Sequence, residues 1–134
     1  MSMFNIFGVS GSAISAQAQR LNVVASNLAN ADAVAGPDGK AYKARQVLFQ
    51  SMPGNDPGTA GVKVQTIHES DAPPRRTLEP SHPSADADGY VTHSNVNPVE
   101  EMVNMISASR SYQNNVEVMN TAKSLMLKTL QMGQ

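Results

Sequence analysis

The sequence lacks cysteine and tryptophan and has few aromatic or charged residues. Aromatic side chains make up 4% of its 134 residues and charged side chains 16%. The missing cysteine excludes disulfide bonds and thiolate chemistry, and it leaves the redox compartment open. A net charge of −1 gives no basic field, which argues against nucleic acid and anionic lipid as partners.

Long hydrophobic runs are also missing. No apolar stretch approaches the roughly 18 to 20 residues of a membrane span, so we expect no direct membrane insertion. Residues 1–12 carry no basic side chain, and no small-residue cleavage site follows an apolar run. We therefore expect no cleaved signal peptide. If the protein leaves the cytoplasm, another route must carry it.

Motifs for catalysis or ligand binding are absent as well. The chain has no Gly-x-Ser-x-Gly elbow, phosphate-binding loop or dinucleotide-binding glycine pattern. His68, His82 and His93 lack the spacing of metal ligands. Residues 84–89 resemble the first half of a calcium loop, but Asn95 stands where the closing glutamate belongs. We expect no enzyme activity, cofactor, metal site or small-molecule substrate.

The strongest hydrophobic patterns lie at the two ends of the chain. Near the N-terminus, apolar residues recur at alternating steps of four and three, which places them on one helical seam. They are Ile14, Ala18, Leu21, Ala25 and Leu28. Near the C-terminus a heptad register is kept by Met102, Met105, Tyr112, Val116, Met119, Met126 and Leu130. Because chain ends otherwise bury little, both seams must pack on each other or on neighbouring subunits, and we predict an assembly interface.

Capping signals predict the ends of the two terminal helices. The first can begin with Ser10 or Ser12 as its N-cap and end near Asn30. The last has a clearer start, because Asn97 is a good N-cap and Pro98 fits the first helical position. The first helix carries a single charge and small polar residues elsewhere, which suits close contact with a second layer of protein.

Prolines and glycines concentrate between the two helices. Seven of the eight prolines and six of the nine glycines lie within 31–97, which excludes a long helix there. Residues 47–49 and 62–67 have the pattern of short strands. We predict a mainly α fold of three parts: an N-terminal helix in 1–30, an irregular middle in 31–97 with short β-hairpin strands, and a long C-terminal helix in 98–134. The two helices are expected to pair as in a coiled coil.

Several motifs carry a resemblance to a known family. The string from Arg20 to Asn30 has the form Arg-Leu-x-x-x-Ala-x-Asn-Leu-Ala-Asn. Further matching positions are His82-Pro83, the run from Ala85 to Val91, Asn95-Val96-Asn97, Glu101-Met102, Met105-Ile106, Ala108, Arg110, Tyr112 and Asn115. With these residues the chain resembles the axial proteins of the bacterial flagellar rod and hook over essentially its whole length.

This resemblance implies a structural role in the flagellar basal body. It implies a non-enzymatic subunit of the proximal rod, the drive shaft that transmits torque through the periplasm, with its terminal helices in an inner coiled-coil layer of a helical assembly. The implied partners are copies of itself, other rod proteins, the adaptor at the rod base and the MS ring. Export through the flagellar type III apparatus without a cleaved signal peptide is implied as well.

Two other functions stay open at the level of sequence. A soluble helical adaptor or chaperone-like binding module would pair its two helices within one monomer or dimer, whereas a polymer subunit would have disordered ends until neighbours cover them. A small hydrolase would need His82 or His93 beside Asp86, for which the proline-rich segment offers no catalytic frame.

Overall fold

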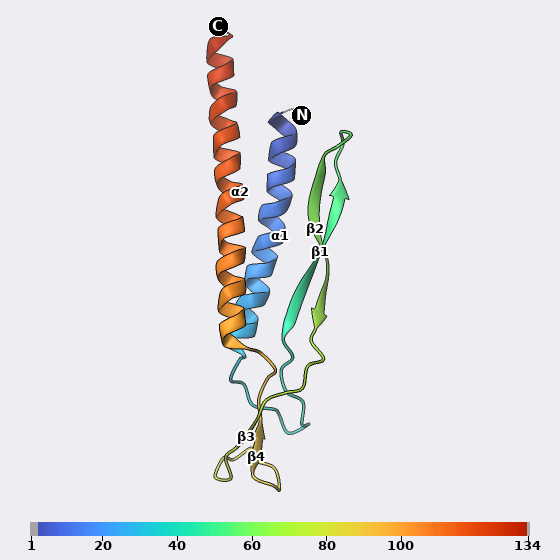
Figure 1. The fold of residues 1–134 in the computed structure, drawn as a ribbon, viewed down its shortest axis with the longest axis vertical. Coiled ribbons are helices and arrows are strands. Elements are labelled where there is room, and N and C mark those ends of the chain that lie inside the picture. Colours follow the sequence, from blue (N-terminus) through green and yellow to red (C-terminus); the bar gives the residue numbers. More distant parts are fainter. Residues whose placement is uncertain (1–2, 134) are drawn as a thin grey trace.

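The computed structural model describes residues 3–133 and combines two long helices with two small antiparallel sheets (Figure 1). In chain order the elements are α1 (Met3–Ala29), β1 (Arg45–Pro53), β2 (Ala60–Glu69), β3 (Arg76–Leu78), β4 (Tyr90–Thr92) and α2 (Pro98–Met132). α1 lies between α2 and the β1–β2 hairpin, and the β3–β4 sheet forms one end of the elongated molecule. The predicted mainly α fold is thus confirmed only in part, because helices and strands both contribute to the architecture.

α2 begins at the predicted residue. The Asn97 backbone is extended, with φ −97° and ψ 108°, and its side chain accepts hydrogen bonds from the backbone N–H groups of Val99 and Glu100. Pro98 is the first helical residue, where its missing N–H costs nothing. With 35 residues against 27 in α1, α2 is longer by roughly 12 Å at 1.5 Å per residue. Its C-terminal end therefore extends past the start of α1.

α1 begins earlier than predicted, at Met3, so the proposed N-caps Ser10 and Ser12 are wrong. Ser10 is buried inside the helix. The Ser12 hydroxyl donates a hydrogen bond of 2.7 Å to the Val9 carbonyl within the same helix. Each glycine in this first stretch costs a helix only about 1 kcal/mol, and packing against α2 and the hairpin outweighs that cost.

β1 and β2 form a hairpin longer than the two short strands predicted for this region. They are antiparallel over nine and ten residues, with one irregularity between Leu48 and Phe49. The hairpin lies along α1, and the Val62 amide donates to the Ser12 hydroxyl at 3.1 Å. Much of the hairpin is polar and exposed. The alternation of apolar and polar residues in the sequence therefore predicted only the part of each strand that faces α1.

The loops below the helices are joined by one side chain. The amide nitrogen of Asn95 donates to the carbonyls of Ser70 and Ala72, at 3.1 and 2.9 Å. Its amide oxygen accepts from the Ala44 N–H at 2.6 Å. A small apolar cluster formed by Ala31, Ala44, Val96 and Tyr42 lies in the same region. Asn95 therefore connects the start of β1, the end of β2 and the approach to α2.

A hydrogen-bonded loop connects β3 to β4. The Asp86 carboxylate accepts from the backbone N–H groups of Tyr90 and Asp88, at 2.9 and 3.0 Å, and pairs with Arg76 at 2.6 Å. These interactions, led by the Tyr90 hydrogen bond, lower the pKa of Asp86. Gly89 has φ +84°, a conformation that glycine adopts without strain. The loop is thus ordered by its own backbone contacts.

Candidate assembly interface

Small and polar side chains occupy the most buried positions of α2 where it packs against α1. Among the helices and strands, α2 packs against α1 alone. Its buried residues Glu101, Ala108 and Ala122 follow one heptad position, with the half-buried Asn115 between them. Within residues 3–133, Glu101 Oε2 and Gln17 Oε1 are buried without a hydrogen-bond partner. None of the fully buried side chains of α2 is a large apolar one, and each unpaired polar atom lowers the stability of the contact further.

The predicted interface residues lie beside this contact or outside it. Half-buried positions are Ile14, Ala18, Leu21, Leu28, Tyr112, Val116, Met119 and Met126, and exposed positions are Ala25, Met102, Met105 and Leu130. No member of the set is fully buried within the single chain. Their apolar surface is available to a second chain.

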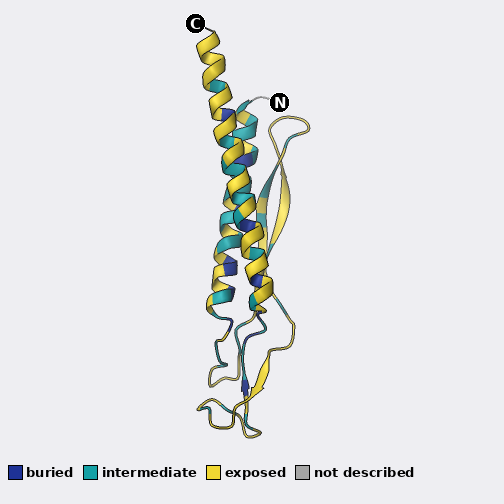
Figure 2. Ribbon diagram, turned by 60° about the vertical axis from the view of Figure 1, so that its left-hand side comes forward, coloured by how far each residue is buried: buried dark blue, intermediate teal, exposed yellow. Residues whose placement is uncertain are grey.

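α2 exposes other large apolar side chains besides the predicted ones, and Figure 2 colours most of this helix as exposed. The exposed set of α2 is Val99, Met102, Val103, Met105, Ile106, Val118, Leu125, Leu127, Leu130 and Met132. They fall into two groups, residues 99–106 and 118–132, and exposed apolar patches on a protein surface mark interaction sites. Several members lie off the predicted heptad seam, so the periodicity search missed them. The presence of Val103, Ile106, Leu125 and Leu127 outside the heptad positions was the signal that could have found them.

At its C-terminal end, α1 is tied to the hairpin by one fully buried side chain. The Asn27 amide nitrogen donates to the Arg45 carbonyl at 2.8 Å. Its amide oxygen accepts from the Arg45 N–H and the Tyr42 hydroxyl, both at 2.9 Å. Burial raises the pKa of the Tyr42 hydroxyl, which donates this hydrogen bond in its protonated form. The family-like motif around Asn27 therefore has a structural role: it fixes the hairpin on α1.

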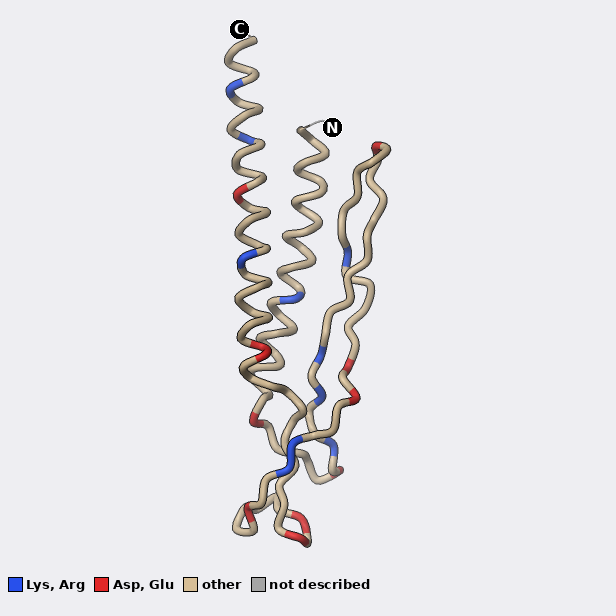
Figure 3. Tube along the Cα trace, viewed as in Figure 1, with Lys and Arg blue, Asp and Glu red and all other residues tan. Residues whose placement is uncertain are grey.

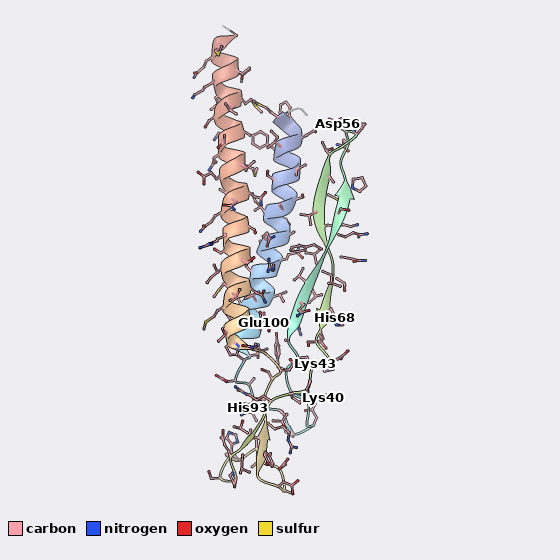
Figure 4. The ribbon with its side chains drawn as sticks, viewed as in Figure 1. Lys40, Lys43, Asp56, His68, His93 and Glu100 are labelled. Carbon is pink, nitrogen blue, oxygen red and sulfur yellow. The ribbon has the colours of Figure 1, made fainter. Side chains whose placement is uncertain are left out.

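The histidines do not assemble into a site. Figure 4 shows His68 and His93 on separate parts of the chain. His82 accepts a hydrogen bond from the Ser84 N–H at 3.0 Å, and Asp86 pairs with Arg76. Across residues 3–133, no group of three or more histidine or carboxylate side chains could hold a metal ion. No helix in that range combines the length and hydropathy needed to cross a bilayer.

Comparisons with known proteins agree on one family. Residues 7–37 match the family described as Flagella basal body rod protein, and residues 87–132 match the family described as Flagellar basal body rod FlgEFG protein C-terminal. The chain is 60% identical to the flagellar basal-body rod protein FlgC of Escherichia coli O6:H1 (strain CFT073) and 58% identical to FlgC of Salmonella typhimurium (strain LT2), in each case over 134 residues. It is 60% identical over 136 residues to FlgC of Yersinia enterocolitica. Each alignment covers 100% of both chains.

Proposed function

The chain belongs to the flagellar basal-body rod protein family and is a structural subunit of the rod rather than an enzyme, and from this we propose how it assembles. The subunit joins the proximal rod in a helical arrangement through its terminal helices. Residues 1–30 and 98–134 form the inner helical domain, and the middle segment, residues 31–97, lies outside it. The rod built in this way transmits torque.

The observation that carries this proposal is the exposed apolar surface of α2. Met102 is 52% exposed, and Leu130 is 62% exposed. Each fully buried side chain of this size gains about 1.5 to 3 kcal/mol relative to exposure. A neighbouring subunit that covers several of them supplies stabilisation that the α1–α2 contact lacks. The predicted seam residues are therefore proposed as contacts between subunits.

The polar contact between the helices supports the same proposal. An adaptor that works as a monomer would need a sufficient apolar core of its own, whereas the buried atoms of Glu101 and Gln17 lack partners within residues 3–133. Ten large apolar side chains of α2 stay exposed, and the larger ones beside its buried positions are only half-buried. This distribution favours a polymer subunit over the adaptor.

The role as a rod subunit also suggests specific binding partners. Copies of this chain and other rod proteins are the proposed neighbours, with the adaptor at the rod base and the MS ring below them. Export through the flagellar type III apparatus leaves the N-terminus uncleaved in this proposal. The intact mass of the subunit purified from basal bodies should show no loss beyond the initiator methionine, whereas a loss of some 15 to 30 residues would indicate a cleaved signal peptide.

Met102→Asp tests the proposed interface. Because Met102 is exposed in the single chain, the substitution should leave folding and export intact. In the assembly it would place an unpaired carboxylate in a desolvated contact, at a cost of about 3 to 5 kcal/mol per subunit. We expect loss of motility in soft agar and incomplete rods by electron microscopy, with normal amounts of exported subunit.

Ser107→Asp is the matched control, since Ser107 is an exposed polar residue of the same helix. It introduces the same charge without replacing an apolar contact, so motility should stay near that of the parent. Normal motility of the Met102→Asp strain, or equal defects in both strains, would contradict the proposal that the exposed apolar residues of α2 form contacts between subunits.

A further inference from the structure

A basic pocket opens beside the start of β1. The cavity measures about 640 Å³, and its charged lining residues are Lys40, Lys43, Arg45 and one carboxylate, that of Glu69. We call this cavity the basic pocket. Figure 4 shows Lys40 and Lys43 in the loop region below the helices. The asparagine that joins these loops, Asn95, also lines the cavity, so the pocket is built on a fixed part of the fold.

The positive charge of this pocket is only partly compensated. Lys43 pairs with Asp71 at 3.5 Å and Arg45 with Glu69 at 3.8 Å, and the paired side chains are all about half exposed or more. Lys40 takes part in no ion pair within residues 3–133. Exposed pairs of this kind are weak. An incoming carboxylate can therefore replace them or bind beside them.

The opposite charge lies at the end of the molecule. Residues 79–89, which we call the acidic tip, contain Glu79, Asp86 and Asp88 and no lysine or arginine. Asp86 is committed to Arg76, whereas Glu79 and Asp88 are exposed and form no ion pair among the described residues. Figure 3 shows these carboxylates at the lower end of the chain, with most of the basic residues of the middle segment above them.

We propose that the acidic tip of one copy docks into the basic pocket of a neighbouring copy. No ion pair joins the two within one chain, as far as residues 3–133 are concerned. A neighbour displaced along the long axis would bring its tip beside the pocket. The proposal rests on the assembly described above and names one of its contacts.

This contact would add something that the apolar helix faces cannot supply. Apolar contacts are not directional, so two helices can slide past one another at little cost. Complementary charges favour one alignment and penalise others. The tip and the pocket together would set the axial offset between neighbouring copies.

A cysteine pair tests this directly, because the chain has no cysteine of its own. One copy carries Ala41→Cys in the lining of the pocket and a second, co-expressed copy carries Ala87→Cys in the tip. All charges are retained. After oxidation of basal bodies from motile cells, we expect a disulfide-linked dimer that contains one copy of each kind. Asn55→Cys, in the exposed loop at the far end of the hairpin, replaces Ala87→Cys as control and should give no such dimer.

Charge reversals then test the chemistry of the contact. Lys40→Glu in the copy with the pocket cysteine should abolish the dimer, and Asp88→Lys in the other copy should restore it. If basal bodies from motile cells contain no mixed dimer, the inference is wrong. The motility of those cells would still be consistent with the proposed function. A pocket cysteine linked instead to a different basal-body protein would also overturn it, because the occupant would not be a second copy.

Discussion

Three asparagines lie where one element ends and another begins. Asn27 connects α1 to β1, Asn95 connects the loops beneath the helices, and Asn97 caps α2. An asparagine amide both donates and accepts, so one side chain can satisfy backbone N–H and carbonyl groups together. At the residue scale, the fold therefore depends on polar groups that satisfy the backbone at these junctions.

Asn27→Ala tests this role. The substitution leaves the Arg45 N–H and carbonyl without partners in a part-buried site, and we expect a loss of about 2 to 4 kcal/mol in local stability. Hydrogen exchange of the Arg45 amide measures that loss. Tyr42→Phe removes a single hydrogen bond to Asn27 and should cost only about 0.5 to 1.5 kcal/mol. Equal effects of the two substitutions would contradict the assigned role of Asn27.

At the element scale, the two helices differ in how many neighbouring elements they pack against. α1 packs against α2 on one side and against the hairpin on the other, whereas α2 packs against α1 alone. The fully buried positions of α2 in this contact are two alanines and a glutamate, and the larger apolar side chains beside them are only half-buried. The helix pair of a single chain is consequently weaker than its length suggests, since most helical stability comes from packing of an apolar face.

Asn115→Leu should strengthen this pair. Asn115 is half-buried on the face of α2 that packs against α1, and its amide nitrogen bonds only within its own helix. Leucine adds apolar contact there and favours the helix, so we expect the free energy of unfolding to rise by about 1 kcal/mol. Asn114→Leu, the same substitution at an exposed neighbour, should change it by less than about 0.5 kcal/mol. Thermal unfolding followed by circular dichroism would measure both, and a destabilised Asn115→Leu variant would contradict the predicted gain.

Stability in the whole molecule is concentrated in the middle and lower parts. The asparagine network and the hairpin connect residues far apart in the sequence, whereas the end of α2 extends beyond α1 (Figure 1). Regions with few buried apolar contacts open most easily. The isolated subunit should therefore have a firm centre and a loosely held C-terminal helix.

Hydrogen exchange of the purified subunit at low concentration checks this distribution. We expect amides of α2 after Ala122 to exchange much faster than those paired in β1 and β2. In the assembled rod, neighbours should protect α2 while the hairpin changes little. Protection of α2 equal to that of the hairpin in the dilute subunit would instead favour a self-sufficient helix pair, as in an adaptor.

The sequence by itself determined the features that depend on local chemistry. Asn97 and Pro98 marked the start of α2, because capping involves neighbouring residues only. The prolines and glycines of the middle segment excluded a long helix, and the alternating residues between them predicted short strands at 47–49 and 62–67, which lie within β1 and β2, whereas the β3–β4 pair was not predicted. The motif from Arg20 to Asn30 indicated the family before any fold was known.

Only the tertiary structure decided where α1 begins, how long the hairpin is and which face of α2 meets α1. Contacts with the hairpin and α2 extended α1 to Met3 through two glycines, and contacts with α1 supported the hairpin beyond its alternating core. The heptad pattern predicts apolar neighbours for Met102 and Leu130. It could not show whether those neighbours belong to the same chain, because hydrophobic attraction depends on the surface covered and not on which chain covers it.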